Sequence, residues 1–146
     1  MPSVRDGRRG LSTDGATGGA RAVDSGMAAD NLFLRIVRGE LPADIVYRDE
    51  LVTAFRDIDP QAPVHVLIVP NHPIASAADV APDDAAALAR LFLAARTIAE
   101  QEGVADGGYR LIVNCRGDGG QEVDQLHLHL LGGEPLGPMR CRRKEG

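Results

Sequence analysis

Residues 119–133 read GGQEVDQLHLHLLGG. Leucine alternates with histidine through its second half, and successive side chains of a β-strand point to opposite faces of the sheet. We therefore expect a strand over residues 126–131 with Leu126, Leu128 and Leu130 on the buried face. The opposite face is then formed by Gln125, His127, His129 and Leu131.

The rest of the chain contains signals for four more strands and two helices. Apolar residues at helical spacing predict a short helix with Asp30 as its N-cap and Gly39 after its end, and a long amphipathic helix over about 82–102. Strands and helices do not alternate regularly, so we expect an α+β fold with an antiparallel sheet of about five strands. The other four strands are predicted over residues 45–47 and 52–55, which form a hairpin, and over residues 64–69 and 109–114.

The 146 residues are enough for one domain with one core. Residues 1–28 are rich in glycine and poor in large apolar side chains, which predicts a disordered N-terminal extension. The domain itself is expected over residues 29–139. Residues 140–146 carry four basic side chains and are expected to form a flexible tail. Translation from Met27 is an alternative to translation from Met1 that the sequence leaves open.

Composition disfavours several classes of protein. The net charge is −5 and aromatic residues make up 3% of the chain, so a nucleic-acid partner is not expected. No apolar run approaches the roughly 18 residues of a membrane span, and the N-terminus lacks the apolar core of a secretory signal. Cys115 and Cys141 have no metal-binding or redox spacing and fit reduced thiols. These features predict a cytoplasmic protein without a membrane partner.

The two histidines of the opening stretch suit chemistry at a phosphoryl group. Side chains two apart on a strand lie about 6.5 to 7 Å from each other, close enough for both imidazoles to touch one phosphate. One neutral ring can act as a nucleophile while its neighbour donates a hydrogen bond. The loop at residues 117–120 offers backbone N–H groups. His65 lies in another predicted strand, and Asn114 ends the predicted strand just before this loop. The alternative is that His127 and His129 are structural side chains of a half-buried strand.

Three segments carry a family resemblance: FRDIDPQAPVHVLIVP (55–70), YRLIVN (109–114) and GGQEVDQLHLHLLGGEPLGPM (119–139). Their order resembles the histidine-triad (HIT) superfamily, and most of all its bacterial Hint branch of purine nucleoside phosphoramidases. The resemblance implies an α+β fold paired into a homodimer. It also implies hydrolysis of the P–N bond of nucleoside 5'-phosphoramidates, such as AMP-lysine or AMP-NH2, without a metal or other cofactor.

The same resemblance implies roles for individual residues. His127 aligns with the nucleophile that forms a nucleotidyl-histidine, His129 with a phosphate and leaving-group contact, and His65 with a supporting histidine. Asp57 corresponds to the carboxylate that holds the ribose hydroxyls of a bound AMP or GMP. Further positions of the implied substrate site are Phe33, Ile36, Phe55 and Ile58 around the purine, and Asn114, Gly120, Gln121, Glu122 and Val123 near the phosphate and leaving group.

The chain departs from the family pattern at Gln125, where the pattern places the first histidine of the triad, and at Asp124, where an aromatic residue is commoner. Glutamine can donate and accept hydrogen bonds, but it cannot titrate. If the first position only orients its neighbour, activity should survive; if it relays protons, turnover should fall. Two alternatives follow: a nucleotide-binding or sensing module with little turnover, and a zinc site formed by His65, His127 and His129.

Overall fold

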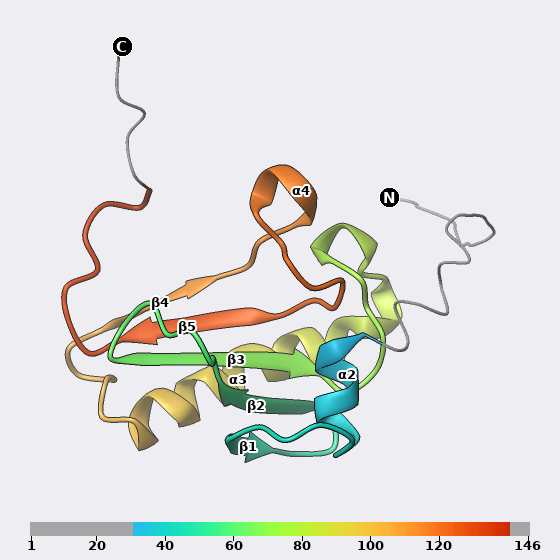
Figure 1. Cartoon of the computed structure of the whole chain (residues 1–146), viewed down its shortest axis with the longest axis horizontal. Helices are drawn as coiled ribbons and strands as arrows, with labels where there is room; N and C mark the ends of the chain where they lie inside the picture. Colours follow the sequence, from blue (N-terminus) through green and yellow to red (C-terminus); the bar gives the residue numbers. More distant parts are fainter. Residues whose placement is uncertain (1–30, 141–146) are drawn as a thin grey trace, which may run out of the picture.

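The computed structural model describes residues 31–140, and they form a five-stranded antiparallel sheet with helices on both faces (Figure 1). The strand order is β1-β2-β3-β5-β4, and every neighbouring pair is antiparallel. This confirms the predicted fold class. The predictions for residues 1–28 and for the tail after Arg140 lie outside the described residues. The strands are β1 (Ile45–Arg48), β2 (Val52–Arg56), β3 (Val64–Pro70), β4 (Tyr109–Ile112) and β5 (Leu128–Gly132).

The helices are one long element and several short ones. The short α2 (Leu32–Val37) has Asn31 as its N-cap, in place of the expected Asp30, because the Asn31 side chain accepts a hydrogen bond from the backbone N–H of Leu34. The predicted long helix is α3 (Ala85–Gln101), and the first turn of the expected range is a separate 3-10 helix, η3 (Pro82–Asp84). Two further turns are η2 (Ala77–Asp79) and α4 (Arg116–Gly119), which forms in the stretch expected to be a glycine-rich loop.

The alternation of side chains divides the sheet into two apolar faces. Leu128 and Leu130 of β5 pack with Val66 and Ile68 of β3 beneath α3, as the sequence predicts for the leucines. Each fully buried leucine contributes about 1.5–3 kcal/mol of apolar transfer free energy. The opposite face carries a smaller cluster beneath α2, which contains Phe33, Ile36, Phe55, Leu67 and Val69, with Val37, Leu41 and Val123 packed against it.

Strand β5 starts two residues later than predicted. The backbone N–H of Leu126 donates to the carbonyl of Ile74 at 2.7 Å, so this residue bonds to the segment after β3 and does not enter the sheet ladder. Strand β4 likewise ends at Ile112, before the predicted end at Asn114. His127 therefore lies just before the regular part of β5, with its side chain still on the expected face of the sheet.

Among the described residues, no helix combines the length and apolar character needed to cross a bilayer.

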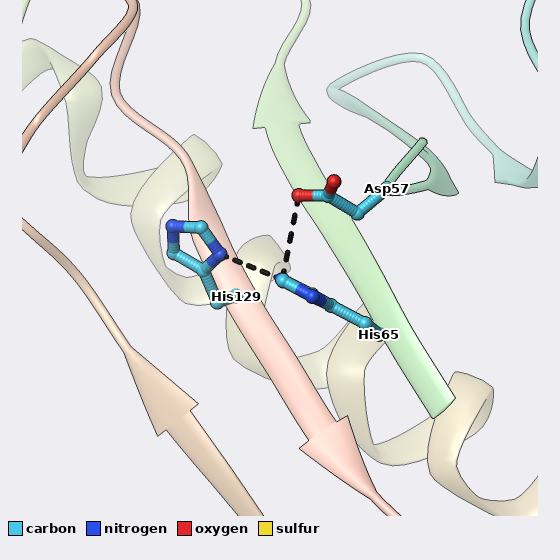
Figure 2. Close-up of side chains that lie close together, drawn as sticks. All are labelled: Asp57, His65 and His129. Carbon is cyan, nitrogen blue, oxygen red and sulfur yellow. Dashed lines mark hydrogen bonds and ion pairs between the residues drawn. The ribbon is translucent and has the colours of Figure 1, made fainter. Parts of the chain in front are cut away.

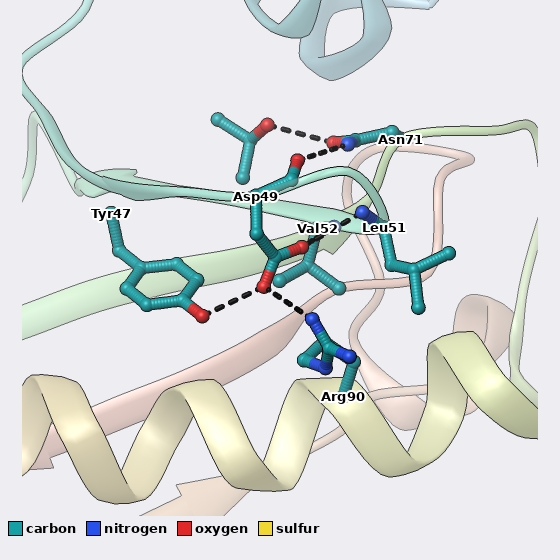
Figure 3. A network of polar contacts seen from close by, with 7 residues as sticks. Tyr47, Asp49, Leu51, Val52, Asn71 and Arg90 are labelled. Atoms are coloured by element: carbon teal, nitrogen blue, oxygen red, sulfur yellow. Dashed lines mark hydrogen bonds and ion pairs between the residues drawn. The ribbon is translucent and has the colours of Figure 1, made fainter.

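A half-buried carboxylate, that of Asp49, ties the β1–β2 turn to α3 (Figure 3). Oδ1 of Asp49 accepts hydrogen bonds from the backbone N–H groups of Leu51 and Val52. Its Oδ2 accepts from the Tyr47 hydroxyl at 2.7 Å and from the Arg90 guanidinium at 3.1 Å. Burial alone would raise the pKa of Asp49, but these donors outweigh it and lower the pKa to about 2.

We predict that Asp49→Asn lowers the free energy of unfolding by about 1–3 kcal/mol at neutral pH, because the amide places a donor against Tyr47 and Arg90. Denaturant titration measures this loss, and Glu50→Gln, an exposed neighbour, is the matched control. Since the folded pKa lies below the ordinary value of 3.8, the carboxylate's stabilisation is present above pH 3.8 and is lost as the pH falls towards 2. A variant as stable as the wild type at neutral pH would contradict the prediction.

Candidate active site

Three polar side chains meet on the face of the sheet opposite α3 (Figure 2). His129 of β5 pairs in register with Leu67 of β3, so its ring reaches diagonally to His65, and Nδ1 of His129 lies 3.0 Å from Nε2 of His65. Asp57 follows β2, and its Oδ2 lies 3.5 Å from the same Nε2. The antiparallel pairing thus brings together residues that are more than sixty positions apart in the chain.

The hydrogen bonds define which nitrogen of each ring carries the hydrogen. Nδ1 of His65 accepts the backbone N–H of Gln61 at 3.0 Å, so a neutral His65 carries its hydrogen on Nε2. That hydrogen is donated to Nδ1 of His129, and the hydrogen of a neutral His129 must then be on Nε2. Nε2 of His129 is buried and has no hydrogen-bond partner among residues 31–140. The array therefore presents an N–H donor that a phosphate oxygen can accept.

The ring of His127 carries its hydrogen on the other nitrogen from His65 and His129. Its Nδ1 lies 2.7 Å from the backbone carbonyl of Gln125, which can only accept, so a neutral His127 carries its hydrogen on Nδ1 and a lone pair on Nε2. The ring is 5% exposed and packs edge-on against Phe33 and His129, with centroid distances of 5.0 and 4.9 Å. A neutral, oriented Nε2 is what a histidine nucleophile requires.

The apolar cluster beneath α2 borders the His127 ring, which Phe33 contacts edge-on. It contains three of the four residues expected around the purine, namely Phe33, Ile36 and Phe55, and the Phe33 and Phe55 rings contact each other edge-on at 5.3 Å. Ile58 does not belong to it. The backbone N–H of Asp59 bonds to Oδ1 of Asp57 and closes a tight turn, and the Ile58 side chain is fully exposed.

The remaining predicted residues lie in the segment that joins β4 to β5. Asn114 is half-buried, Gly120 ends α4 with a φ of 85°, and Glu122 is exposed. Gln121 was expected near the phosphate and leaving group. Its Nε2 donates to the carbonyls of Ala75 and Val123, and its Oε1 accepts the N–H of Arg116. In this structure Gln121 therefore shapes the segment, and Val123 packs against the apolar cluster.

Comparison with known proteins gives the family. A model of the HIT domain matches residues 38–136. The chain belongs to the HIT family. It is 58% identical over 117 residues to the Escherichia coli K12 protein named purine nucleoside phosphoramidase. The aligned residues cover 80% of this chain and 98% of that protein. The resemblance to the bacterial Hint branch is thereby confirmed.

Solved HIT structures agree with the fold. A histidine triad protein from Clostridium difficile superimposes with a TM-score of 0.73 at 38% identity, covering 76% of this chain and 96% of that one. A HIT family hydrolase from Legionella pneumophila gives a TM-score of 0.69 at 48% identity, covering 73% and 98% of the two chains.

Two residues that position this HIT site were not expected from the sequence. One is Gln61, whose backbone N–H fixes the hydrogen of His65. The other is Asn31, whose amide caps α2 and also donates to the carbonyl of Asp124. A loop backbone donor gives no residue-specific signal, while Asn31 is a common N-cap type directly before an apolar run and could have been found.

The donor set does not fit a metal ion well. One oxygen or nitrogen each of Asp57, His65 and His129 lie within 4.8 Å of one another, a spacing that could hold a cation. However, a metal-bound histidine usually donates from its other ring nitrogen, whereas Nδ1 of His65 accepts from Gln61. Binding through Nε2 would require loss of the Gln61 hydrogen bond or a doubly deprotonated ring. The same restriction applies to the zinc alternative built from His65, His127 and His129.

Burial keeps the histidine array neutral. Desolvation, with smaller contributions from the His127 and His65 rings, lowers the pKa of His129 to about 4, although Asp57 opposes the shift. Burial also lowers the pKa of His65, against the carboxylates of Asp57 and Asp59. At neutral pH, both rings then keep the single-hydrogen forms that their hydrogen bonds require.

We predict that His129 makes stability fall in mild acid. Because its folded pKa of about 4 lies below the ordinary 6.5, the unfolded chain takes up a proton first as the pH falls. The contribution of neutral His129 to the free energy of unfolding is thus complete above pH 6.5 and is lost as the pH falls towards 4. His129→Asn should reduce the change in melting temperature across this window, while His72→Asn, an exposed histidine, should preserve it. An unchanged pH dependence in His129→Asn would contradict this assignment.

Proposed function

We propose that this protein is a hydrolase that cleaves the P–N bond of purine nucleoside 5'-phosphoramidates through a nucleotidyl-histidine at His127. The observation that carries the proposal is the complementary state of two adjacent rings: Nε2 of His127 has a lone pair, and Nε2 of His129 has a buried hydrogen to donate. The phosphoramidase name of the E. coli relative supports the same reaction class.

In the proposed first step, Nε2 of His127 attacks the α-phosphorus and the P–N bond breaks. The nitrogen leaves as an amine with the bonding electron pair and a proton from solvent. Water then attacks the nucleotidyl-histidine, which releases the nucleoside monophosphate and a proton and restores the neutral ring. The N–H of His129 would stabilise the negative phosphoryl oxygen, and one such donor is typically worth about 2.7–4 kcal/mol in the transition state.

The neighbouring residues give the proposed nucleotide site its polarity. The purine would lie against the cluster of Phe33, Ile36 and Phe55. Asp57 would accept hydrogen bonds from the ribose hydroxyls, since each carboxylate oxygen keeps a lone pair beyond its contacts with Asp59 and His65. Asn114, Gly120 and Glu122 remain proposed contacts on the phosphate and leaving-group side.

The alternative is a nucleotide-binding or sensing module with little turnover. Gln125, at the position where the resemblance places a titratable histidine, motivates it. Both functions need the same pocket, so binding of AMP cannot separate them and turnover can.

We predict that the protein releases ammonia from adenosine 5'-phosphoramidate. His127→Ala should reduce kcat by at least about 10⁴-fold, because removal of a nucleophile abolishes the covalent route. His72→Ala, whose imidazole is exposed and pairs with Asp84, is the matched control and should retain activity. Binding of AMP without ammonia release would reject the hydrolase in favour of the sensing module.

We also propose that the protein acts as a homodimer, as the family resemblance implies. Within the described residues, β4 pairs with β5 alone, so its other edge is available to a second strand. Exposed apolar side chains support an interface with a second copy, notably Phe92 and Leu93 on α3 and Val113 after β4. A closed two-fold pair would cover such surfaces.

For the dimer, we predict that light scattering on the full chain gives twice its mass of 15.5 kDa at micromolar concentration. Phe92→Asp should shift the measured mass towards that of the monomer if α3 contributes to the interface, because it places a charge in an apolar contact. The wild-type chain measured as a monomer would refute the dimer.

A further inference from the structure

The side chain of Gln125 is a fully buried amide with all of its hydrogen-bonding groups in use. Its Nε2 donates to the carbonyl of His72 at 2.8 Å and to that of Pro70 at 3.2 Å. Its Oε1 accepts the backbone N–H of Ile74 at 3.2 Å and Nδ2 of Asn31 at 3.4 Å. The amide thus fastens the segment after β3 to the N-cap of α2.

Gln125 is connected to His127 in two ways, through its own backbone and through α2. The backbone carbonyl of Gln125 itself accepts the Nδ1 hydrogen of His127 at 2.7 Å. Asn31 caps α2, and α2 carries Phe33, whose ring packs edge-on against the His127 ring. The position of the Gln125 side chain therefore determines the place of the carbonyl that orients His127 and of the aromatic ring that packs against it.

Glutamine matches this environment better than the residues that resemble it. The surroundings present two carbonyl oxygens and two N–H donors, and only a primary amide supplies two donors and two acceptor lone pairs at one site. Glutamate has no donor for the carbonyls of Pro70 and His72. Histidine has two ring nitrogens and can satisfy half of the contacts.

We propose that Gln125 is a positioning residue, whose buried amide holds the Nδ1–H form of His127 and aims its Nε2 at the substrate. The inference rests on the proposed function, in which His127 is the nucleophile. Gln125 acts through the backbone and through α2, and its side chain takes no part in the array formed by Asp57, His65 and His129. Gln125 thus supports the geometry of this site and does not stand in for a proton relay.

Two substitutions separate positioning from a lost relay. Gln125→Met keeps the side-chain length and removes every polar contact, and Gln125→His introduces a titratable ring. Gln101→Met, at the exposed end of α3, is the control for glutamine loss. The readouts are kcat and KM with adenosine 5'-phosphoramidate, and the 15N imidazole signals of His127 in the free protein, which distinguish the two neutral forms of the ring.

We expect Gln125→Met to lower kcat on the order of 100-fold, the usual effect of a misplaced reacting group, with a smaller change in KM. Its His127 signals should show a mixture of both neutral forms, while the wild type and Gln101→Met show the Nδ1–H form alone. Gln125→His should not exceed the wild-type kcat. A methionine variant with unchanged kcat and an unchanged Nδ1–H signal would overturn the proposal, and so would a histidine variant with raised kcat.

The test remains decisive if one variant or the function itself fails. Should Gln125→Met not fold, Gln125→His carries the comparison: a kcat at or below the wild-type value supports positioning, and a higher one rejects it. If the wild type hydrolyses no phosphoramidate, the proposed function fails, whereas the imidazole signals of the free protein still test how Gln125 controls His127.

Discussion

Strands β3 and β5 pair in the interior of the sheet, and their register fixes which side chains face each side. It places Leu128 and Leu130 beside Val66 and Ile68 under α3, and on the other face it brings His129 diagonally across to His65. Because the side-chain period of a strand is two residues, a slip by one position would put leucines in the site and imidazoles in the core. The core therefore enforces the geometry of the histidines, and the free energy of apolar burial holds the site together.

Within that frame, backbone groups give chemically equivalent side chains different properties. A loop N–H fixes the hydrogen of His65, and a carbonyl fixes that of His127. The consequence is that His127 presents a lone pair on Nε2, while its neighbour His129 presents a hydrogen on Nε2. Such pre-orientation costs no reorganisation during a reaction, which is why electrostatic stabilisation in a buried site is effective. The same arrangement weakens the case for a bound metal.

Much of this could be predicted from the sequence, because it follows from periodicity. The alternation in residues 126–131 predicts which side chains face α3, and the spacing of apolar residues predicts α2 and α3. The family resemblance added the convergence of His65, His127 and His129, and the structure places all three rings on one face.

What could not be predicted depends on contacts without a sequence period. The partners of the Gln125 amide are mostly backbone groups of the turn after β3, so residue types do not reveal them. The partners of the Gln121 amide could not be predicted for the same reason, since backbone carbonyls of Ala75 and Val123 accept its hydrogens. Ile58 was expected among apolar neighbours, but the hydrogen bond between Asp59 and Asp57 turns that segment outward. Arg116 adopts a φ of 59°, which pattern rules reserve mainly for glycine and asparagine, and α4 starts at that residue.

The sheet separates two networks that respond to acid at different points. On one face, burial lowers the pKa of His129 to about 4, and on the other, hydrogen-bond donors lower the pKa of Asp49 to about 2. As a solution is acidified, the imidazole array gains charge while the carboxylate still holds the β1–β2 turn to α3. The charge of the imidazole array therefore changes at a higher pH than the charge of the carboxylate that anchors the β1–β2 turn.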